Sequence, residues 1–304
     1  MKPESFDPGL TTQFSGALRR TINHDGTFNV RRKGLRLRDT NLYLMLIDTT
    51  WPRFLTVVLL AFLAINMVFA GIYLAIGIDH LRGAGPQMDD FLNAFFFSVH
   101  TLTTVGYGNV YPFGTAANAI AALEAATGLM VFALATGLLY GRFSRPSAKI
   151  LFSRQALIAP YQDGTSLQFR ITNARRNVLI DLEARVMLMT VNRADGQLKR
   201  SFFDLPLERR QVYFFPLTWT VVHPIDSDSP FYRKTAEELR ALEAELLILI
   251  KGFDDTFSQL VHSQYSYRHD EFLWGAKFEP AFRIDDRGDL VLDVNRVHEL
   301  KMVQ

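Results

Sequence analysis

The stretch "DDFLNAFFFSVHTLTTVGYGNVYP", residues 89–112, is largely apolar but too short to cross a membrane as a helix and return. It lies between two longer apolar stretches, residues 54–78 without a charged side chain and residues 111–141 with Glu124 as the only charge. Each of these exceeds the roughly 20 residues that a transmembrane helix needs. Because lipid tolerates non-helical backbone only where protein buries it or where it lines water, the middle stretch predicts a re-entrant loop between two spans.

These stretches divide the 304-residue chain into four expected regions. They are an extended N-terminal cytoplasmic tail at 1–38, an interfacial helix at 39–52, a transmembrane pore domain at 53–145 and a cytoplasmic β-domain at 146–304. Within the pore domain we expect spans at about 54–78 and 113–141, a re-entrant helix at about 91–102 and an extended segment at 104–108.

A short helix along the inner membrane surface is predicted before the first span. Asp39 or Thr40 is placed to cap it, and Pro52 follows its end. The residues that share one face at helical spacing are Leu42, Met45, Leu46 and Thr49. This pattern is typical of an interfacial amphipathic helix, and an ordinary soluble helix is the alternative.

After Lys149 the sequence changes to strand-length apolar segments. Examples are "SLQFRITN", "DLEARVMLMTV", "QVYFFPLTWTVV" and "EAELLILIKGF", which Gly, Pro, Asn and Asp separate from one another. The run "KTAEELRALEAEL" alternates in charge and predicts a short solvated helix that leads into a strand. Short strands without long helices between them indicate an antiparallel β-sandwich.

The basic residues predict the orientation of the chain in the membrane. They are frequent before the first span and after the second, whereas the loop at 79–90 contains only Arg82. By the positive-inside rule both termini are expected in the cytoplasm, with the chain in the cell's inner (plasma) membrane. The polar, basic N-terminal region lacks an apolar core, so a cleaved signal peptide is not expected.

Composition argues against several other classes of protein. The chain has no cysteine, which excludes disulfides and thiolate metal sites, and its net charge of +2 gives no reason to expect a nucleic-acid partner. It contains no paired-carboxylate motif, phosphate loop or HExxH, so no enzyme is predicted. Four scattered histidines without ligand spacing are interpreted as structural or surface residues: His223, His262, His269 and His298.

The re-entrant loop contains the features of an ion site. Asp89 and Asp90 favour the start of a helix, whose opposite end would carry partial negative charge toward the membrane centre and stabilise a cation. Gly106 and Gly108 accept positive φ, as a backbone with successive carbonyls on one side requires. Thr104 to Gly108 read "TVGYG", which resembles the filter sequence of potassium channels.

The expected ligands of K⁺ are the backbone carbonyls of Thr104, Val105, Gly106 and Tyr107. The alternative is that the segment is only a glycine turn between two helices. One chain supplies one wall of a pore, so a cyclic assembly of several copies is expected.

The second span presents one face toward the expected pore. Its residues on a helical projection are Leu129, Phe132, Thr136 and Tyr140. Tyr140 lies at the cytoplasmic end, where rings from the several copies would close the path by dewetting; a lipid-facing interfacial aromatic is the alternative. Gly128 and Gly137 allow close packing or bending of the helix.

Glu124 is the only ionisable residue in the second span. Ionisable residues inside a membrane span indicate a functional role, and they pair with another polar group. The projection turns Glu124 about 120° from the pore face, toward the re-entrant helix, where His100 is the expected partner. Both residues are therefore predicted to support the filter, with a direct charge in the cavity as the alternative for Glu124.

Four segments together resemble prokaryotic inward-rectifier potassium channels: "FFFSVHTLTTVGYG", "LEAATGLM", "GLLYGRFSRPSAKILFS" and "WTVVHPIDSDSPFY". The resemblance runs from about Asp39 almost to the C-terminus. It implies a homotetramer with two membrane helices, a pore helix, a slide helix and an immunoglobulin-like cytoplasmic sandwich. It also implies a bundle-crossing constriction at Tyr140, hinges at Gly128 and Gly137, and no cofactor besides the permeant K⁺.

Two positions depart from the family pattern. His100 stands where members commonly have Glu, so the buried network behind the filter is expected to differ. Phe132 stands where eukaryotic relatives have an acidic residue, which argues against strong block by polyamines or magnesium.

The resemblance also implies regulation by anionic lipids. The candidate residues for the lipid site are Arg53, Arg142, Arg145 and Lys149, each worth about 1 kcal/mol near an anionic leaflet. The alternative is that these charges only set the topology. A membrane-anchored sensory or binding protein with a degenerate pore is the second functional hypothesis, and the intact "TVGYG" argues against it.

Overall fold

The computed structural model describes residues 9–10, 13–14, 19–31, 33–34, 41–85, 88–144, 148–194 and 197–303. The chain forms two compact units. Residues 32–145 form the first, called the pore unit, and residues 1–31 together with 146–304 form the second, called the β-domain.

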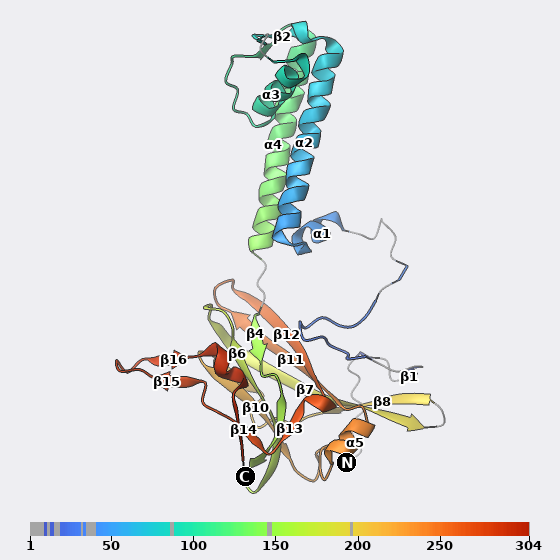
Figure 1. Cartoon of the computed structure of the whole chain (residues 1–304), viewed down its shortest axis with the longest axis vertical. Helices are drawn as coiled ribbons and strands as arrows, with labels where there is room; N and C mark the ends of the chain where they lie inside the picture. The colour runs from blue at the N-terminus through green and yellow to red at the C-terminus, as the bar shows by residue number, and fades with distance from the viewer. Residues whose placement is uncertain are drawn as a thin grey trace. The chain divides into compact units, whose positions relative to one another are not determined.

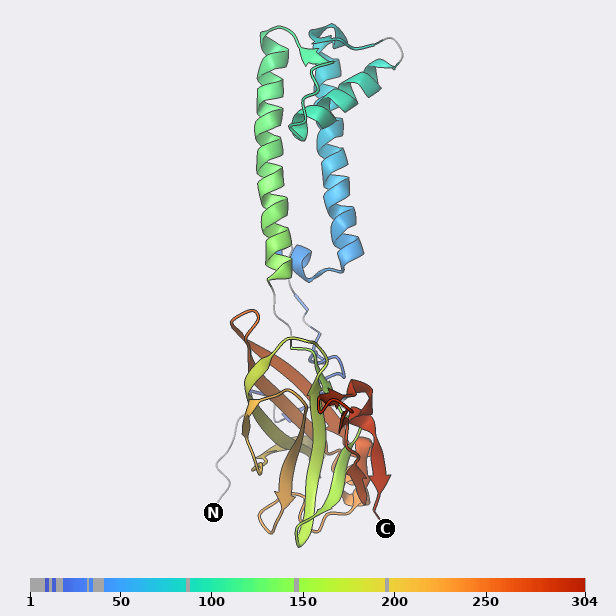
Figure 2. The ribbon, with the colours of Figure 1, turned by 90° about the vertical axis from the view of Figure 1, so that its left-hand side faces the viewer.

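The pore unit consists of four helices, α1 (Leu42–Asp48), α2 (Trp51–Ile76), α3 (Asp90–Leu102) and α4 (Thr115–Phe143). Figure 2 shows α2 and α4 as two long helices of opposite direction, with α3 at the end of the pair where the chain turns back. Both are long and apolar enough to cross a membrane, by length and composition. These helices are the two predicted spans.

The helix ends differ from the expected ones by at most three residues in α2, α3 and α4, and more in α1. Asn41 caps α1 by accepting hydrogen bonds from the backbone N–H groups of Tyr43 and Leu44, at 3.1 and 3.4 Å, so the expected cap at Asp39 or Thr40 is wrong; those two residues lie outside the described ones. Helix α1 ends at Asp48, because Pro52 stands in the first turn of α2 and starts a new helix.

A small two-stranded sheet connects the segments on either side of α3 in the pore unit. Strands β2 (Leu81–Arg82) and β3 (Tyr111–Pro112) pair antiparallel, after the 3₁₀ turn η2 (Ile78–His80). The apolar core beneath them joins α2 to α3 and consists of Phe69, Ala70, Tyr73, Leu81, Ala94 and Phe97. The re-entrant loop is therefore attached at both its ends.

Two sheets pack face to face in the β-domain (Figure 1). The first contains β1 (Gln13–Phe14), β8 (Gln197–Asp204), β7 (Leu179–Ala194), β11 (Glu245–Asp254) and β12 (Gln259–Arg268) in this order, with β9 (Gln211–Phe214) beside β7. The second contains β10 (Thr218–Ile225), β6 (Gly164–Asn173), β5 (Ala156–Tyr161) and β13 (Phe272–Trp274), with β4 (Ile150–Phe152) beside β6.

Smaller elements complete the β-domain. They are the pairs β14 (Ala276–Phe278) with β17 (Leu300–Met302) and β15 (Phe282–Ile284) with β16 (Leu290–Leu292), the helix α5 (Ala236–Ala241), and the 3₁₀ turns η3 (His269–Glu271) and η4 (Val294–His298). Thr235 and Glu238 form a capping box at α5, in the run predicted to be a short helix.

Buried apolar side chains from both sheets form one core, to which β6, β7, β11 and β12 all contribute. The predicted fold class, a helical membrane module followed by a β-sandwich, is confirmed. Two details differ from the expectation. Strands β5 and β13 pair parallel, and Pro216 splits the segment "QVYFFPLTWTVV" into β9 and β10, which belong to different sheets.

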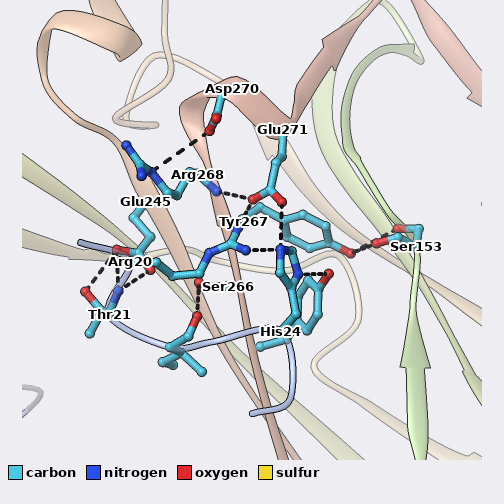
Figure 3. A network of polar contacts seen from close by, with 12 residues as sticks. Arg20, Thr21, His24, Ser153, Glu245, Ser266, Tyr267, Arg268, Asp270 and Glu271 are labelled. Carbon is cyan, nitrogen blue, oxygen red and sulfur yellow. Dashed lines mark hydrogen bonds and ion pairs between the residues drawn. The ribbon is translucent and has the colours of Figure 1, made fainter. Parts of the chain in front are cut away.

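Residues 19–31, here called the N-terminal strap, are folded onto the β-domain and do not form the expected extended tail (Figure 3). Ile22 is 4% exposed and packs with Met189 and Leu247. Glu245 accepts hydrogen bonds from the backbone N–H and the hydroxyl of Thr21, both at 2.9 Å. Strap and sheet are joined by apolar burial and by hydrogen bonds, which a free tail would lack.

A polar cluster around His24 holds the same strap. Arg20 contacts both His24 and Glu271, and Nε2 of His24 lies 3.3 Å from Glu271. Nδ1 of His24 lies 2.6 Å from the hydroxyl of Tyr265. Arg20 approaches Nε2 as a donor, whereas the Glu271 carboxylate on the same side of the ring is an acceptor. Partial burial, followed by the charge of Arg20, lowers the pKa of His24.

We expect acid to loosen the N-terminal strap. A lowered pKa in the folded state means that the contribution of His24 is complete above the ordinary value of about 6.5 and is lost as the pH falls through the lower folded value. The chain has no cysteine, so a spin label on Asn29→Cys reports the strap alone. Its mobility should rise between about pH 8 and pH 5, the range in which histidine titrates.

His24→Gln should remove this pH response, whereas His262→Gln, at an exposed histidine of β12, should keep it. Tyr265 and Glu271 face His24 and remain in both variants. A label with the same mobility at both pH values in the unsubstituted strap would contradict the expectation.

Candidate functional site

The filter segment, residues 104–108, continues directly from the C-terminal end of α3. The carbonyl oxygen of His100 accepts hydrogen bonds from the N–H groups of Val105 and Gly106, at 3.0 and 3.2 Å. Thr103 donates its hydroxyl to the carbonyl of Val99 at 2.6 Å. The last turn of α3 therefore holds the start of the filter segment and fixes where it begins.

The backbone of the filter segment alternates in conformation. Thr104, Gly106 and Gly108 have φ values of +59°, +53° and +79°, whereas Val105 and Tyr107 do not have positive φ. This is the alternation that turns successive peptide units to one side. The sequence predicted positive φ at the two glycines but not at Thr104. A β-branched residue there is strained, and strain of this kind concentrates at functional sites.

The carbonyl groups of the filter segment are available as ligands. Across the parts of the chain that the structure describes, the oxygens of Thr104, Val105, Gly106 and Tyr107 accept no hydrogen bond. Residues 103–109 are all exposed in the single chain, so these oxygens are open to water or to an ion. The segment therefore has the geometry and the chemistry of an oxygen-lined cation site.

The chain beyond the filter segment is tied to the loop between α2 and α3. Phe113 donates its backbone N–H to His80 at 2.7 Å, and the guanidinium of Arg82 lies 3.4 Å from the ring centre of Phe113. Gly83 has a φ of +86° and lies so close to the carbonyl of Asn109 that a Cβ would overlap it. Both ends of the filter segment are thus anchored within the pore unit.

His100 and Glu124 do not form the expected pair. The ring of His100 meets the ring of Tyr107 edge to face, with centroids 4.9 Å apart. Glu124 is fully buried and instead contacts Ser98 of α3 and the hydroxyl of Tyr73 in α2, the latter at 2.7 Å. The reason is geometric, because residues 98 and 100 project from α3 about 200° apart. The sequence did not predict Ser98 and Tyr73 as the partners of Glu124.

Gly128 and Gly137 of α4 have different surroundings. A Cβ at Gly128 would overlap the carbonyl oxygen of Leu102 and lie 2.9 Å from its carbon, whereas nothing lies within 4 Å of one at Gly137. Gly128 therefore lets α4 touch the end of α3, which is a packing role.

The predicted pore face of α4 points away from α2 and α3. In the single chain its four members are all exposed: Leu129, Phe132, Thr136 and Tyr140. Leu123, Met130 and Leu134 are exposed as well, so one chain alone does not separate a pore face from a lipid face.

Arg142 joins α4 to the end of α1. Its Nη1 donates to the carbonyls of Leu46 and Ile47, at 2.5 and 2.9 Å, and its Nη2 donates to Thr49 at 2.8 Å. Its guanidinium also lies 4.6 Å from the ring centres of Trp51 and Phe54. The three carbonyls that Arg142 contacts lie at the C-terminal end of α1, where the partial negative charge of the helix attracts a cation.

The other lipid candidates have fewer contacts. Arg53 is exposed on α2, and Lys149 is exposed in the β-domain. Arg145 lies outside the described residues. A lipid headgroup would therefore compete with α1 for Arg142 but not for Arg53.

Comparison with known proteins identifies the family. Residues 150–304 match the inward rectifier potassium channel C-terminal domain, and residues 56–145 match an ion channel family. The chain is 38% identical over 284 residues to inward rectifier potassium channel Kirbac3.1 of Paramagnetospirillum magnetotacticum, which covers 92% of this chain and 95% of that protein. The chain belongs to the inward rectifier potassium channel family.

Animal inward rectifiers are more distant relatives. Human inward rectifier potassium channel 4 is 25% identical over 300 residues, and mouse ATP-sensitive inward rectifier potassium channel 12 is 25% identical over 282 residues. Each match covers 85% of this chain and about two thirds of the animal protein, at 66% and 65%. As an inward-rectifier family protein, the chain is not an enzyme.

His223 is a buried histidine of the β-domain. Both ring nitrogens of His223 have partners, Nδ1 at 2.6 Å from the carbonyl of Pro206 and Nε2 at 2.8 Å from the hydroxyl of Ser229. Burial lowers the pKa of His223, which keeps the ring neutral. Within the described ranges, no three His, Asp or Glu side chains are grouped as metal ligands.

Proposed function

We propose that this inward-rectifier family member is a potassium-selective channel in which four copies surround one pore. The observation that carries the proposal is the alternating backbone of Thr104–Gly108 with unpaired carbonyls. Four such segments give rings of oxygen atoms from Thr104, Val105, Gly106 and Tyr107, which replace the water around a dehydrated K⁺. The C-terminal end of α3 adds partial negative charge beside this path.

The proposed location is the inner membrane, with both termini in the cytoplasm. We further propose that Phe132, which stands in place of an acidic residue, leaves the cavity without a strong site for polyamines or magnesium. The backbone alternation disfavours a sensory protein with a degenerate pore, because that role places no demand on φ at Thr104.

A flux assay tests the proposed function. Purified protein in liposomes should take up rubidium or potassium far faster than sodium, and barium should block the uptake. Empty liposomes provide the control. Equal rates for potassium and sodium in correctly assembled protein would refute the selectivity claim.

The proposed gate is the ring of Tyr140, because apolar constrictions close a pore by dewetting. Tyr140→Ala should raise the basal flux, whereas Tyr140→Phe, which keeps the ring, should leave it close to that of the unsubstituted channel. A flux in Tyr140→Ala that is unchanged or lower, in protein that still assembles, would remove Tyr140 from the gate.

We propose different roles for the two glycines and for the basic residues. Gly128 fixes α4 against α3, which leaves Gly137 as the position where α4 bends. Anionic lipid acts at the cytoplasmic surface through Arg53, Arg145 and Lys149. Arg142 acts differently, since its position against α1 couples the interfacial helix to the end of α4 that carries Tyr140.

A further inference from the structure

Four buried polar side chains connect helices α2, α3 and α4 of the pore unit behind the filter segment. They are Asn66 and Tyr73 of α2, Ser98 of α3 and Glu124 of α4, and each is fully buried. Ser98 lies between Asn66, at 3.0 Å from its Oδ1, and Oε1 of Glu124. The hydroxyl of Tyr73 lies 2.7 Å from Oε2 of Glu124. Among the described residues, no cationic side chain pairs with Glu124.

The orientation of the Asn66 amide is fixed by its second partner. Nδ2 of Asn66 lies 2.7 Å from the carbonyl oxygen of Phe62. A carbonyl only accepts hydrogen bonds, so the nitrogen must face Phe62 and the oxygen must face Ser98. The flipped amide would place two oxygens against each other. Oδ1 of Asn66 is therefore an acceptor toward Ser98.

Counting hydrogens then determines the state of Glu124. Ser98 has one hydroxyl hydrogen, and Asn66 requires it. The contact between Ser98 and Oε1 of Glu124 needs a second hydrogen, which only the carboxyl group is able to supply. The hydroxyl of Tyr73 donates to the remaining oxygen, Oε2. With a protonated Glu124, every contact in the cluster has one donor and one acceptor.

An ionised Glu124 would leave the cluster one hydrogen short. If Ser98 donated to the carboxylate, Oδ1 of Asn66 would face a lone pair and lose its partner, and the reverse choice would leave Oε1 unpaired. The charge would also be buried without a counter-ion, which proteins avoid because its desolvation is not repaid. The missing hydrogen and the buried, uncompensated charge both disfavour the carboxylate.

We infer that Glu124 is a neutral carboxylic acid that donates its hydrogen to Ser98, and that this hydrogen, not a charge, positions α3 between α2 and α4. Glu124 is thus a positioning residue for the filter, since α3 carries the segment Thr104–Gly108. The inference rests on the proposed function only where it concerns potassium selectivity. The protonation state stands independently of that function.

Infrared spectroscopy measures the protonation state directly. At about pH 8 ordinary carboxyl groups are ionised, so a carbonyl band of a protonated acid is specific. The spectrum of the purified channel minus that of Glu124→Gln should contain this band, and the band should shift in heavy water. Glu183→Gln, which removes an exposed carboxylate of β7, should change only carboxylate bands. A carboxylate band in the Glu124→Gln difference would overturn the inference.

Flux measurements test the positioning role. Glu124→Gln keeps one donor and one acceptor, so its potassium-to-sodium flux ratio should stay within about twofold of the unsubstituted channel. Glu124→Ala leaves the hydroxyl groups of Ser98 and Tyr73 without their partner, and its potassium-to-sodium flux ratio should fall by about tenfold or more. If Glu124→Gln assembles but loses selectivity as Glu124→Ala does, the positioning role is wrong. If the unsubstituted channel is itself unselective, the proposed function fails while the infrared result still decides the protonation state.

Discussion

Gly106→Ala is expected to abolish selective potassium flux without unfolding the rest of the chain. Gly106 has a φ of +53°, and among the described residues of the single chain nothing lies within 4 Å of a Cβ built there, so the expected obstacle is the backbone conformation. A left-handed conformation costs an L-residue about 1–2 kcal/mol. The cost arises once in each of the four copies, and relaxing it would rotate one ring of carbonyls away from the pore.

The measurement is rubidium uptake by liposomes that contain equal amounts of assembled protein. Gly71→Ala provides a matched control, because Gly71 lies within α2, has no positive φ and also has nothing within 4 Å of its Cβ position. The control should conduct normally. A Gly106→Ala channel that conducts and selects like the control would show that positive φ at this position is not required.

Gly128→Ala is expected to disrupt the contact between α3 and α4 and with it the assembled pore. An added methyl group overlaps the carbonyl of Leu102, which is backbone at the base of the filter and has no rotamer to change. Overpacking costs about 1–3 kcal/mol even where neighbours adjust. Here the neighbour is the end of α3, so the filter segment itself would move.

Gly137→Ala is the matched comparison, since its methyl group meets nothing within 4 Å and alanine favours the helix by roughly 1 kcal/mol. Thermal unfolding and the fraction of assembled protein in detergent should fall for Gly128→Ala and stay level or rise for Gly137→Ala. Equal stability of the two variants would contradict the packing role of Gly128.

Much of the pore unit was predictable because membrane helices follow simple rules. The two spans are uncharged runs longer than the bilayer requires, and Asp89 caps α3 by accepting from Leu92 at 2.8 Å, where negative charge was expected. The glycines of the filter signalled positive φ. Positive φ at Thr104 was not predictable from the sequence, because this conformation is unfavourable for a β-branched residue and only the surrounding structure imposes it.

Long-range partners were not predictable from the sequence. A helical projection of α4 gives the face on which Glu124 lies, but it does not show which residue of α3 lies opposite. The titratable residue His100 was therefore expected as the partner, whereas the structure has Ser98 there. The contact of Thr21 with Glu245 joins residues 224 positions apart, without any local pattern. The order of strands in the β-domain, including the parallel pairing of β5 with β13, likewise depends on tertiary packing.

The central claim is that four carbonyl-lined segments select potassium. The most direct test is the zero-current potential of the purified channel in a planar bilayer with potassium on one side and sodium on the other. We predict a potential that is displaced strongly in the direction set by potassium, and a return toward zero when sodium on the second side is replaced by potassium. A potential near zero in the potassium–sodium gradient would contradict the account.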